Sequence, residues 1–215
     1  MKNSKKAGIL IAILVVPVLV FGFIKTFFVN EFIHLEKINP SIEGCEANLV
    51  DNFHQVPSFS GIDQQGNAFQ SDQLKGKISV VNFITTREKN KQLSFSMARA
   101  LERFNSEDDV ILLSHTLDPQ HDSSQVLANF AKDYRAQAGK WYFIQGAAET
   151  IESLTTCGYG VKITQENSQR SATTFVVVDK KGHIRGYYEG MDRKDINRMM
   201  DEIAILLLEY KKQNG

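Results

Sequence analysis

Hydrophobic residues follow two different periods along most of the chain. Four runs are almost continuously apolar and rich in β-branched or aromatic residues, which is typical of strands covered on both faces. They lie at residues 78–84, 109–114, 141–144 and 173–179. Other segments place apolar residues three and four positions apart, which predicts amphipathic helices. These helices are expected at residues 93–104, 126–134, 147–156 and 196–210, the second of them capped by Ser123 or Ser124.

Two hairpins complete the predicted order of elements. Phe59 and Phe69 flank the turn residues 63–67, and the turn 180–182 leads into a further strand at residues 183–189. Strands that alternate with helices and close on a hairpin and a helix favour an α/β fold. We therefore predict a thioredoxin-like sandwich, in which a central mixed sheet carries helices on both faces and an N-terminal hairpin precedes them.

The N-terminal segment predicts a membrane anchor. Residues 7–24 contain no charge, and this run is close to the roughly 20 residues that span a bilayer. Three lysines precede the run and Lys25 follows it, which orients the N-terminus toward the cytoplasm. A cleaved signal peptide is the alternative, but no A-x-A-like site follows the run. We expect a basic tip and single-pass anchor at residues 1–29, a polar linker at 30–53, and a folded domain at 54–215. The predicted location is the cell (inner) membrane, with the domain periplasmic.

The distribution of charge argues against nucleic acid as a partner. The chain has 25 basic and 25 acidic residues, but four lysines lie in the first 25 positions, where no acidic residue occurs. The remaining chain therefore has 21 basic against 25 acidic residues. A mildly acidic domain of this kind lacks the basic surface that binds phosphate backbones.

The two cysteines belong to no local motif. Cys45 and Cys157 are 112 positions apart. An exported domain can form a disulfide, but the sequence does not place the two Cα atoms within the roughly 7 Å that a bridge requires. Two separate thiols, with Cys157 packed near a helix end, are the favoured interpretation. Because there is no C-x-x-C pair, thiol–disulfide oxidoreductase or peroxidase activity is the least favoured function.

Three stretches together resemble one family. Residues 59–83 contain F-x-x-x-D-x-x-G and L-K-G-K-x-x-V-V-N-F, which resemble the opening of extracytoplasmic thioredoxin-like domains. Residues 114–122 (SHTLDPQHD) resemble the S-x-D-P-x-x-D loop of the Sco/SenC copper chaperones, and residues 177–190 are similar to their closing hairpin. The resemblance covers roughly residues 55–210, and the predicted anchor fits it. It implies a role in the assembly of cytochrome c oxidase.

The resemblance also locates a copper site whose ligands are missing. In the family the turn after the first core strand reads F-x-x-T-x-C-P-x-x-C-P, and its two cysteines bind copper together with a later histidine. Phe83 and Thr86 match this pattern, but the cysteines fall on Glu88 and Gln92. The histidine falls on Ser171, with Arg170 as the alternative register. Soft thiolates favour Cu(I), whereas carboxylate, amide and hydroxyl groups do not. No copper is therefore expected at these positions.

Other candidate residues have alternative interpretations. Asp118 matches an acidic family residue near the metal, but an Asp before a proline is also ordinary turn chemistry, and we favour a capping role. His115 and His121, with Cys157, are the candidates for a displaced metal site; solvent-exposed loop histidines are the favoured interpretation.

Two functions follow from these observations. The favoured one is a non-catalytic, anchored Sco-like protein that binds an unidentified envelope or respiratory-assembly protein. The alternative is a copper chaperone with displaced ligands. If the backbone of the family site is preserved, Glu88 or Gln92 should form a polar contact with Ser171.

Overall fold

The computed structural model describes residues 15–23, 34–41, 43–46, 48–87, 91–166 and 169–213, with the backbone alone for Glu166, Gln169 and Arg170. The chain divides into two compact units, Met1–His34 and Leu35–Gly215. In the first unit residues 15–23 are helical. The helices within the described residues include none that is long and apolar enough to cross a membrane. The rest of the predicted anchor lies outside the described residues.

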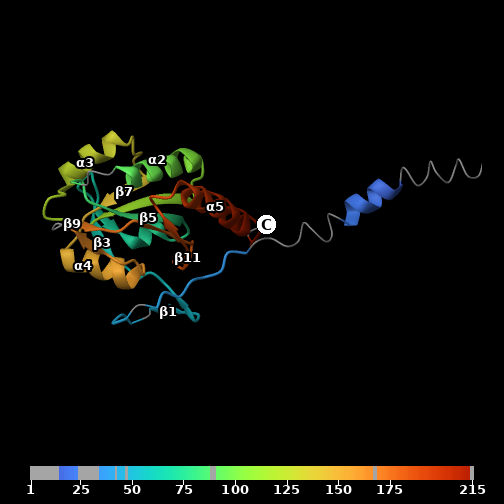
Figure 1. Cartoon of the computed structure of the whole chain (residues 1–215), viewed down its shortest axis with the longest axis horizontal. Coiled ribbons are helices and arrows are strands. Elements are labelled where there is room, and N and C mark those ends of the chain that lie inside the picture. The colour runs from blue at the N-terminus through green and yellow to red at the C-terminus, as the bar shows by residue number, and fades with distance from the viewer. Residues whose placement is uncertain are drawn as a thin grey trace, which may run out of the picture. The chain divides into compact units, whose positions relative to one another are not determined.

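A five-stranded mixed sheet forms the centre of the second unit (Figure 1). Its order is β11–β10–β5–β6–β7, and the strands are β5 (Ile78–Ile84), β6 (Val110–Thr116), β7 (Trp141–Ile144), β10 (Thr174–Val178) and β11 (Ile184–Glu189). Strands β5, β6 and β7 are parallel, whereas β10 is antiparallel to both β5 and β11. The carboxyl ends of β5 and β6 therefore lie at the same edge of the sheet as the start of β10.

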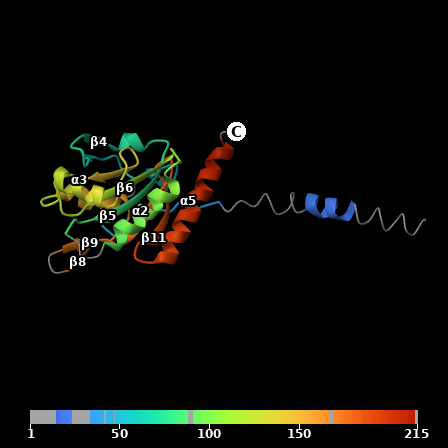
Figure 2. The same cartoon turned by 90° about the horizontal axis from the view of Figure 1, so that it is seen from above.

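Helices cover both faces of this sheet, as the sequence predicted (Figures 1 and 2). Alternate residues of β5 belong to two separate cores, with Val80 in one and Val81 in the other. The Val80 core is covered by α2 (Gln92–Phe104), α3 (Ser124–Asp133) and α5 (Arg193–Gln213). The Val81 core is covered by α4 (Ala148–Ser153) and the π-helical turn η2 (Leu154–Gly158). The predicted thioredoxin-like arrangement is confirmed.

The predicted N-terminal hairpin covers the outer strand β7. It consists of β3 (Ser60–Ile62) and β4 (Ala68–Gln70), and a 3₁₀ turn, η1 (Ser71–Leu74), follows it. In the hairpin turn the Gln64 amide donates to the Trp141 carbonyl (2.9 Å) and accepts from the Phe143 amide (3.0 Å). This side chain therefore occupies hydrogen-bonding groups that an edge strand otherwise leaves exposed.

A second edge is covered by a segment that the sequence predicted to be a linker. Residues 35–54, here called the N-terminal strap, pack on the folded unit and include the short strands β1 (Leu49–Val50) and β2 (Phe53–His54). The Ile38 amide donates to the Ile184 carbonyl of β11 (2.8 Å), and the Arg185 guanidinium contacts the Leu35 carbonyl. The prediction of a linker at residues 30–53 was wrong from Leu35 onward, because its polar composition concealed these backbone contacts.

The two cysteines form a disulfide, which corrects the prediction of separate thiols. Cys45 of the strap is bonded to Cys157 of η2, and their Cα atoms lie 5.4 Å apart. The distance in sequence hid this proximity, because the strap brings Cys45 against η2, where Cys157 lies 112 positions further along the chain. With both cores, both covered sheet edges and its own disulfide, the unit 35–215 has the features of an independently folding domain.

A buried ionic cluster joins the strap to the end of the chain. Arg185 pairs with Asp179 (3.0 Å) and with Glu209 of α5 (3.0 Å), and all three side chains are almost fully buried. Buried charges of this kind are tolerated only when they are paired. Because Arg185 also contacts Leu35, the cluster fixes both ends of the domain against β11.

Candidate functional site at the carboxyl edge of the sheet

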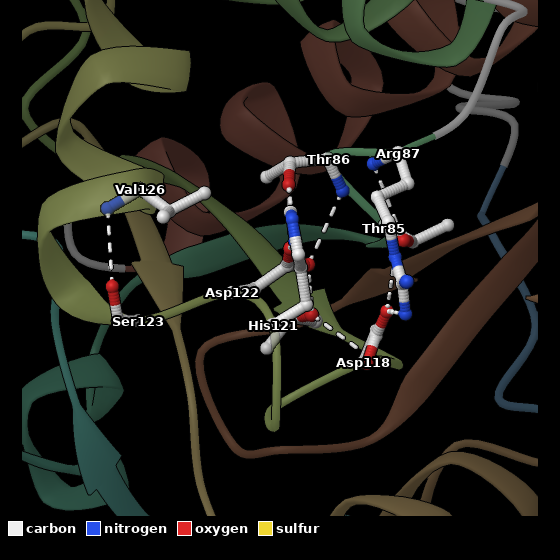
Figure 3. A network of polar contacts seen from close by, with 9 residues as sticks. Thr85, Thr86, Arg87, Asp118, His121, Asp122, Ser123 and Val126 are labelled. Carbon is white, nitrogen blue, oxygen red and sulfur yellow. Dashed lines mark hydrogen bonds and ion pairs between the residues drawn. The ribbon is translucent and has the colours of Figure 1, made fainter.

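The turn that follows β5 and the loop that follows β6 lie together at the carboxyl edge of the sheet (Figure 3). The Leu117 amide donates to the Ile84 carbonyl (2.8 Å), which continues the pairing of the two strands beyond their ends. This edge is where parallel α/β sheets usually place functional residues. It is also where the sequence located the family copper site.

Asp122 is the centre of the polar network at this edge. Its carboxylate is fully buried and accepts hydrogen bonds from the Thr86 hydroxyl (2.5 Å), the Thr86 amide (3.2 Å) and the Thr116 hydroxyl (2.5 Å). The His121 Nδ1 atom lies 2.9 Å from the same carboxylate. Figure 3 shows the side chains of Thr86, His121 and Asp122 close together between the two loops. One buried carboxylate therefore holds the start of the turn after β5 in place.

The loop after β6 is shaped by its own backbone. The Asp118 carbonyl accepts from the amides of His121 (3.1 Å) and Asp122 (2.9 Å), and the Asp118 amide donates to the Thr116 hydroxyl (3.0 Å). Ser123 then caps α3 by accepting from the Val126 amide (3.4 Å), which decides between the two predicted caps. These backbone hydrogen bonds position Asp122 at the edge of the sheet.

The Asp118 side chain does not have the capping role that the sequence favoured. Its carboxylate accepts from Arg87, whose Nε lies 2.8 Å away and whose terminal nitrogen is also in contact. Only the Asp118 backbone serves the turn. The carboxylate therefore provides a second link between the two loops, immediately before residues 88–90.

Replacing Asp122 should destabilise the domain strongly. In Asp122→Ala the donors of half-buried Thr86 and buried Thr116 lose their acceptor, and we expect a loss of about 3 kcal/mol in the free energy of unfolding. Asp118→Ala is the matched control, because it removes a more exposed pair with Arg87 and should cost about 1 kcal/mol or less. Urea unfolding of the 35–215 domain measures both. Equal losses in the two variants would show that Asp122 does not organise this edge.

The three positions that align with the family ligands lie in different parts of the structure or outside its described residues. Glu88 lies outside the described residues. Gln92 is the first residue of α2, and Ser171 ends β9 (Gln169–Ser171), which pairs with β8 (Thr164–Glu166). The Ser171 hydroxyl lies 3.0 Å from that of Thr164, within the same hairpin. This hairpin was not predicted, because both of its strands are polar. Ser171 precedes β10 and so approaches the same sheet edge, but a contact of Glu88 or Gln92 with Ser171 stays a prediction.

The structure does not bring together His115, His121 and Cys157, the candidates for a displaced metal site. Cys157 is consumed by the disulfide, and the His121 ring lies beside Asp122. His115 is fully buried within β6, which corrects its prediction as a solvent-exposed loop histidine. Within the described parts of the chain, no three His, Cys, Asp or Glu residues are arranged to hold a metal ion.

His115 lies among aromatic rings on the Val81 side of the sheet. Its ring centroid is 5.1 Å from that of Phe59 and 6.0 Å from that of Phe83, and its Nε2 atom is 3.3 Å from the Tyr159 hydroxyl. Burial lowers the pKa of His115 to about 3. The imidazole is therefore neutral at physiological pH and serves as a core residue.

This burial should make the stability of the domain sensitive to acid. An unfolded histidine has a pKa of about 6.5, so the unfolded state binds a proton that the folded state refuses between pH 6.5 and about 3. The stabilisation is complete above pH 6.5 and is lost as the pH falls, by up to about 1.4 kcal/mol per pH unit. His115→Phe should remove this part of the slope. Urea unfolding of both proteins across this range tests it, and parallel slopes would contradict the assignment.

The fold and the site define a class of protein. The domain is a thioredoxin-like sandwich with a polar network around Asp122 at the carboxyl edge of its sheet, and its sequence has no cysteine in the turn after β5. The SCO1/SenC family model matches residues 48–207. The chain belongs to this family.

Individual relatives agree with this assignment. The chain is 22% identical to a SCO2-like protein of Rickettsia felis over 200 residues, which cover 90% of this chain and 99% of the relative. It is similar in structure to BsSco, described as a member of the Sco family of cytochrome c oxidase assembly proteins (TM-score 0.63, 19% identity, 75% of this chain and 98% of the other). It is also similar to Arabidopsis thaliana ScoI with copper bound (TM-score 0.60, 19% identity, 72% and 98%). These structural similarities concern the fold.

Proposed function

We propose that this protein acts by binding another protein during assembly of cytochrome c oxidase or of a related envelope complex, without carrying copper at the family position. The observation that carries the proposal is a contrast at one edge of the sheet. Asp122 holds the turn after β5 through Thr86, yet the aligned ligand positions carry Glu88, Gln92 and Ser171. This contrast supports a site that keeps the family scaffold and lacks its soft ligands.

The donor chemistry at these positions does not fit Cu(I). Carboxylate, amide and hydroxyl groups are hard donors, and hard donors suit Mg²⁺ or Ca²⁺ better than Cu(I). The sequence offers no other cysteine than Cys45 and Cys157, which are bonded to each other. Copper delivery with displaced ligands is therefore the weaker candidate, and no catalytic step is assigned to the site.

We further propose that the domain lies outside the cytoplasm, behind an anchor at residues 7–24. The lysine asymmetry around this uncharged run supports the orientation. The disulfide supports an oxidising compartment, because such bonds rarely persist in the cytosol. A C-terminal alkaline phosphatase fusion, which is active only after export, should be active in cells. An inactive but intact fusion would refute this location.

Deletion of the gene tests the function. Cells without the protein should lose cytochrome c oxidase activity, and added copper should not restore it, because the missing step is a protein contact. The wild-type gene should restore activity, and crosslinking should recover an oxidase subunit or assembly factor with the protein. Restoration by copper alone would favour metal delivery, and unchanged oxidase activity would exclude a role in that complex.

A further inference from the structure

A cavity of about 520 Å³ lies at the opposite end of the sheet from the candidate site. It opens beside the β1–β2 hairpin and reaches Ser79 near the start of β5, whereas the candidate site follows Ile84 at the end of that strand. Its volume is within the range of small-molecule sites, which hold roughly 300–1,000 Å³.

The walls of this cavity are mainly apolar. Val56, Phe59, Leu74, Tyr159 and Val178 line it. Exposed Val50 lines it at the β1–β2 hairpin, next to exposed Leu49. Burial of this apolar surface by a bound molecule removes it from water, which favours binding.

Two buried polar side chains, Ser79 and His183, line the cavity. Ser79 is 3% exposed and interrupts the apolar run of β5, and its hydroxyl makes none of the side-chain hydrogen bonds found in the described part of the chain. His183 also lines the cavity; its Nδ1 atom lies 3.5 Å from the Asp179 carboxylate, and neither ring nitrogen makes a hydrogen bond to the residues described. Buried polar groups are usually hydrogen-bonded, so these two invite a ligand with a polar atom.

The charges around the cavity are largely neutralised. Lys75 pairs with Asp72 (2.9 Å), Lys180 contacts Asp109, and Asp179 pairs with Arg185 (3.0 Å). Burial lowers the pKa of His183, so its imidazole stays neutral. The remaining rim groups, Asp51 and Lys181, have opposite signs. The lining therefore offers no excess charge to attract an ionic ligand.

We propose that this cavity binds an uncharged, largely apolar small molecule whose carbonyl or hydroxyl oxygen accepts a hydrogen bond from Ser79. The apolar body of the molecule packs between Phe59, Leu74 and Tyr159. The cavity shares no part of the carboxyl-edge turn. This binding site therefore does not rest on the proposed function.

The test uses an uncharged naphthyl ketone, 6-propionyl-2-(dimethylamino)naphthalene, whose emission shifts to the blue in apolar sites. The 35–215 domain should bind it saturably, and should bind the anionic anilinonaphthalene sulfonate at least roughly ten-fold more weakly, because burial of an unpaired charge is costly. Absence of saturable binding, or tighter binding of the anion, would overturn the proposal.

Variants locate the bound probe. Leu74→Trp and Val50→Trp fill the cavity from two sides, and each should weaken binding at least ten-fold by occupying the apolar space. Leu208→Trp is the control, because Leu208 is exposed on α5 and does not line the cavity, and it should bind normally. Ser79→Ala should weaken binding roughly five-fold through loss of one hydrogen bond. Circular dichroism identifies a misfolded variant, and equal affinity in every folded variant contradicts the site.

Discussion

Removing the disulfide should strongly lower the stability of the domain. The double variant Cys45→Ser, Cys157→Ser is expected to lose about 4 kcal/mol in the free energy of unfolding. The bond closes a loop with a sequence separation of 112, and constraint of the unfolded chain by a loop of about 100 residues contributes roughly 4.7 kcal/mol. The strap should also loosen, because its covalent link to η2 is lost.

Urea unfolding of the oxidised wild type and of the variant measures this effect. A control variant, Ser41→Ala with Ser153→Ala, changes two nearby hydroxyls without touching the link and should remain within about 0.5 kcal/mol of wild type. Reduction of the wild type with dithiothreitol should reproduce the loss and leave the double variant unaffected. A double variant as stable as the oxidised wild type would show that the strap is held by its other contacts alone.

Restoring the family ligands should create a Cu(I) site. The triple variant Glu88→Cys, Gln92→Cys, Ser171→His is expected to change copper retention from none to one equivalent per chain. Gln92 is the first residue of α2, and the two new thiols stand four positions apart in the sequence, which is the spacing of the two family cysteines. The imidazole enters from the residues before β10, which start at the same sheet edge. Thiolates with an imidazole form a soft donor set that favours Cu(I).

The measurement is competition with a Cu(I) chelator, made with the native disulfide intact and verified by mass. The same triple change with Arg170→His in place of Ser171→His distinguishes the two registers of the histidine. The Cys45→Ser, Cys157→Ser background is the control for copper bound by those two thiols. A folded triple variant that takes up no copper in either register would mean that the family geometry is not preserved.

The strands and helices were largely predictable because each core segment has one clear period. The strands at residues 78–84 and 141–144 have the predicted bounds, since β-branched and aromatic runs covered on both faces form strands in almost any context. The hairpin β8–β9 was missed because its polar residues carry no alternation. Helix α4 ends before its predicted limit, at the π-helical turn that holds Cys157.

The contacts of the site were less predictable, because they join distant segments. Cys45 meets Cys157 only through the path of the strap, and a polar sequence gives no indication of that path. Asp122 was visible as the last residue of the D-P-x-x-D pattern, but its contacts were not, because they join it to Thr86 in the turn after β5 and to Thr116 at the end of β6. His115 was assigned to a loop because the predicted strand ended at Ser114, whereas β6 continues to Thr116.

Competition between the unmodified 35–215 domain and a Cu(I) chelator tests most directly the proposal that the chain lacks the copper ligands of the family. The disulfide is left intact, and the chelator is chosen to be weaker than a two-thiolate site. Because Glu88, Gln92 and Ser171 provide hard donors, the chelator should keep all the copper at every protein concentration. Retention of one equivalent of Cu(I) by the oxidised domain would contradict this, and would mean that the chain carries copper through residues other than the aligned positions.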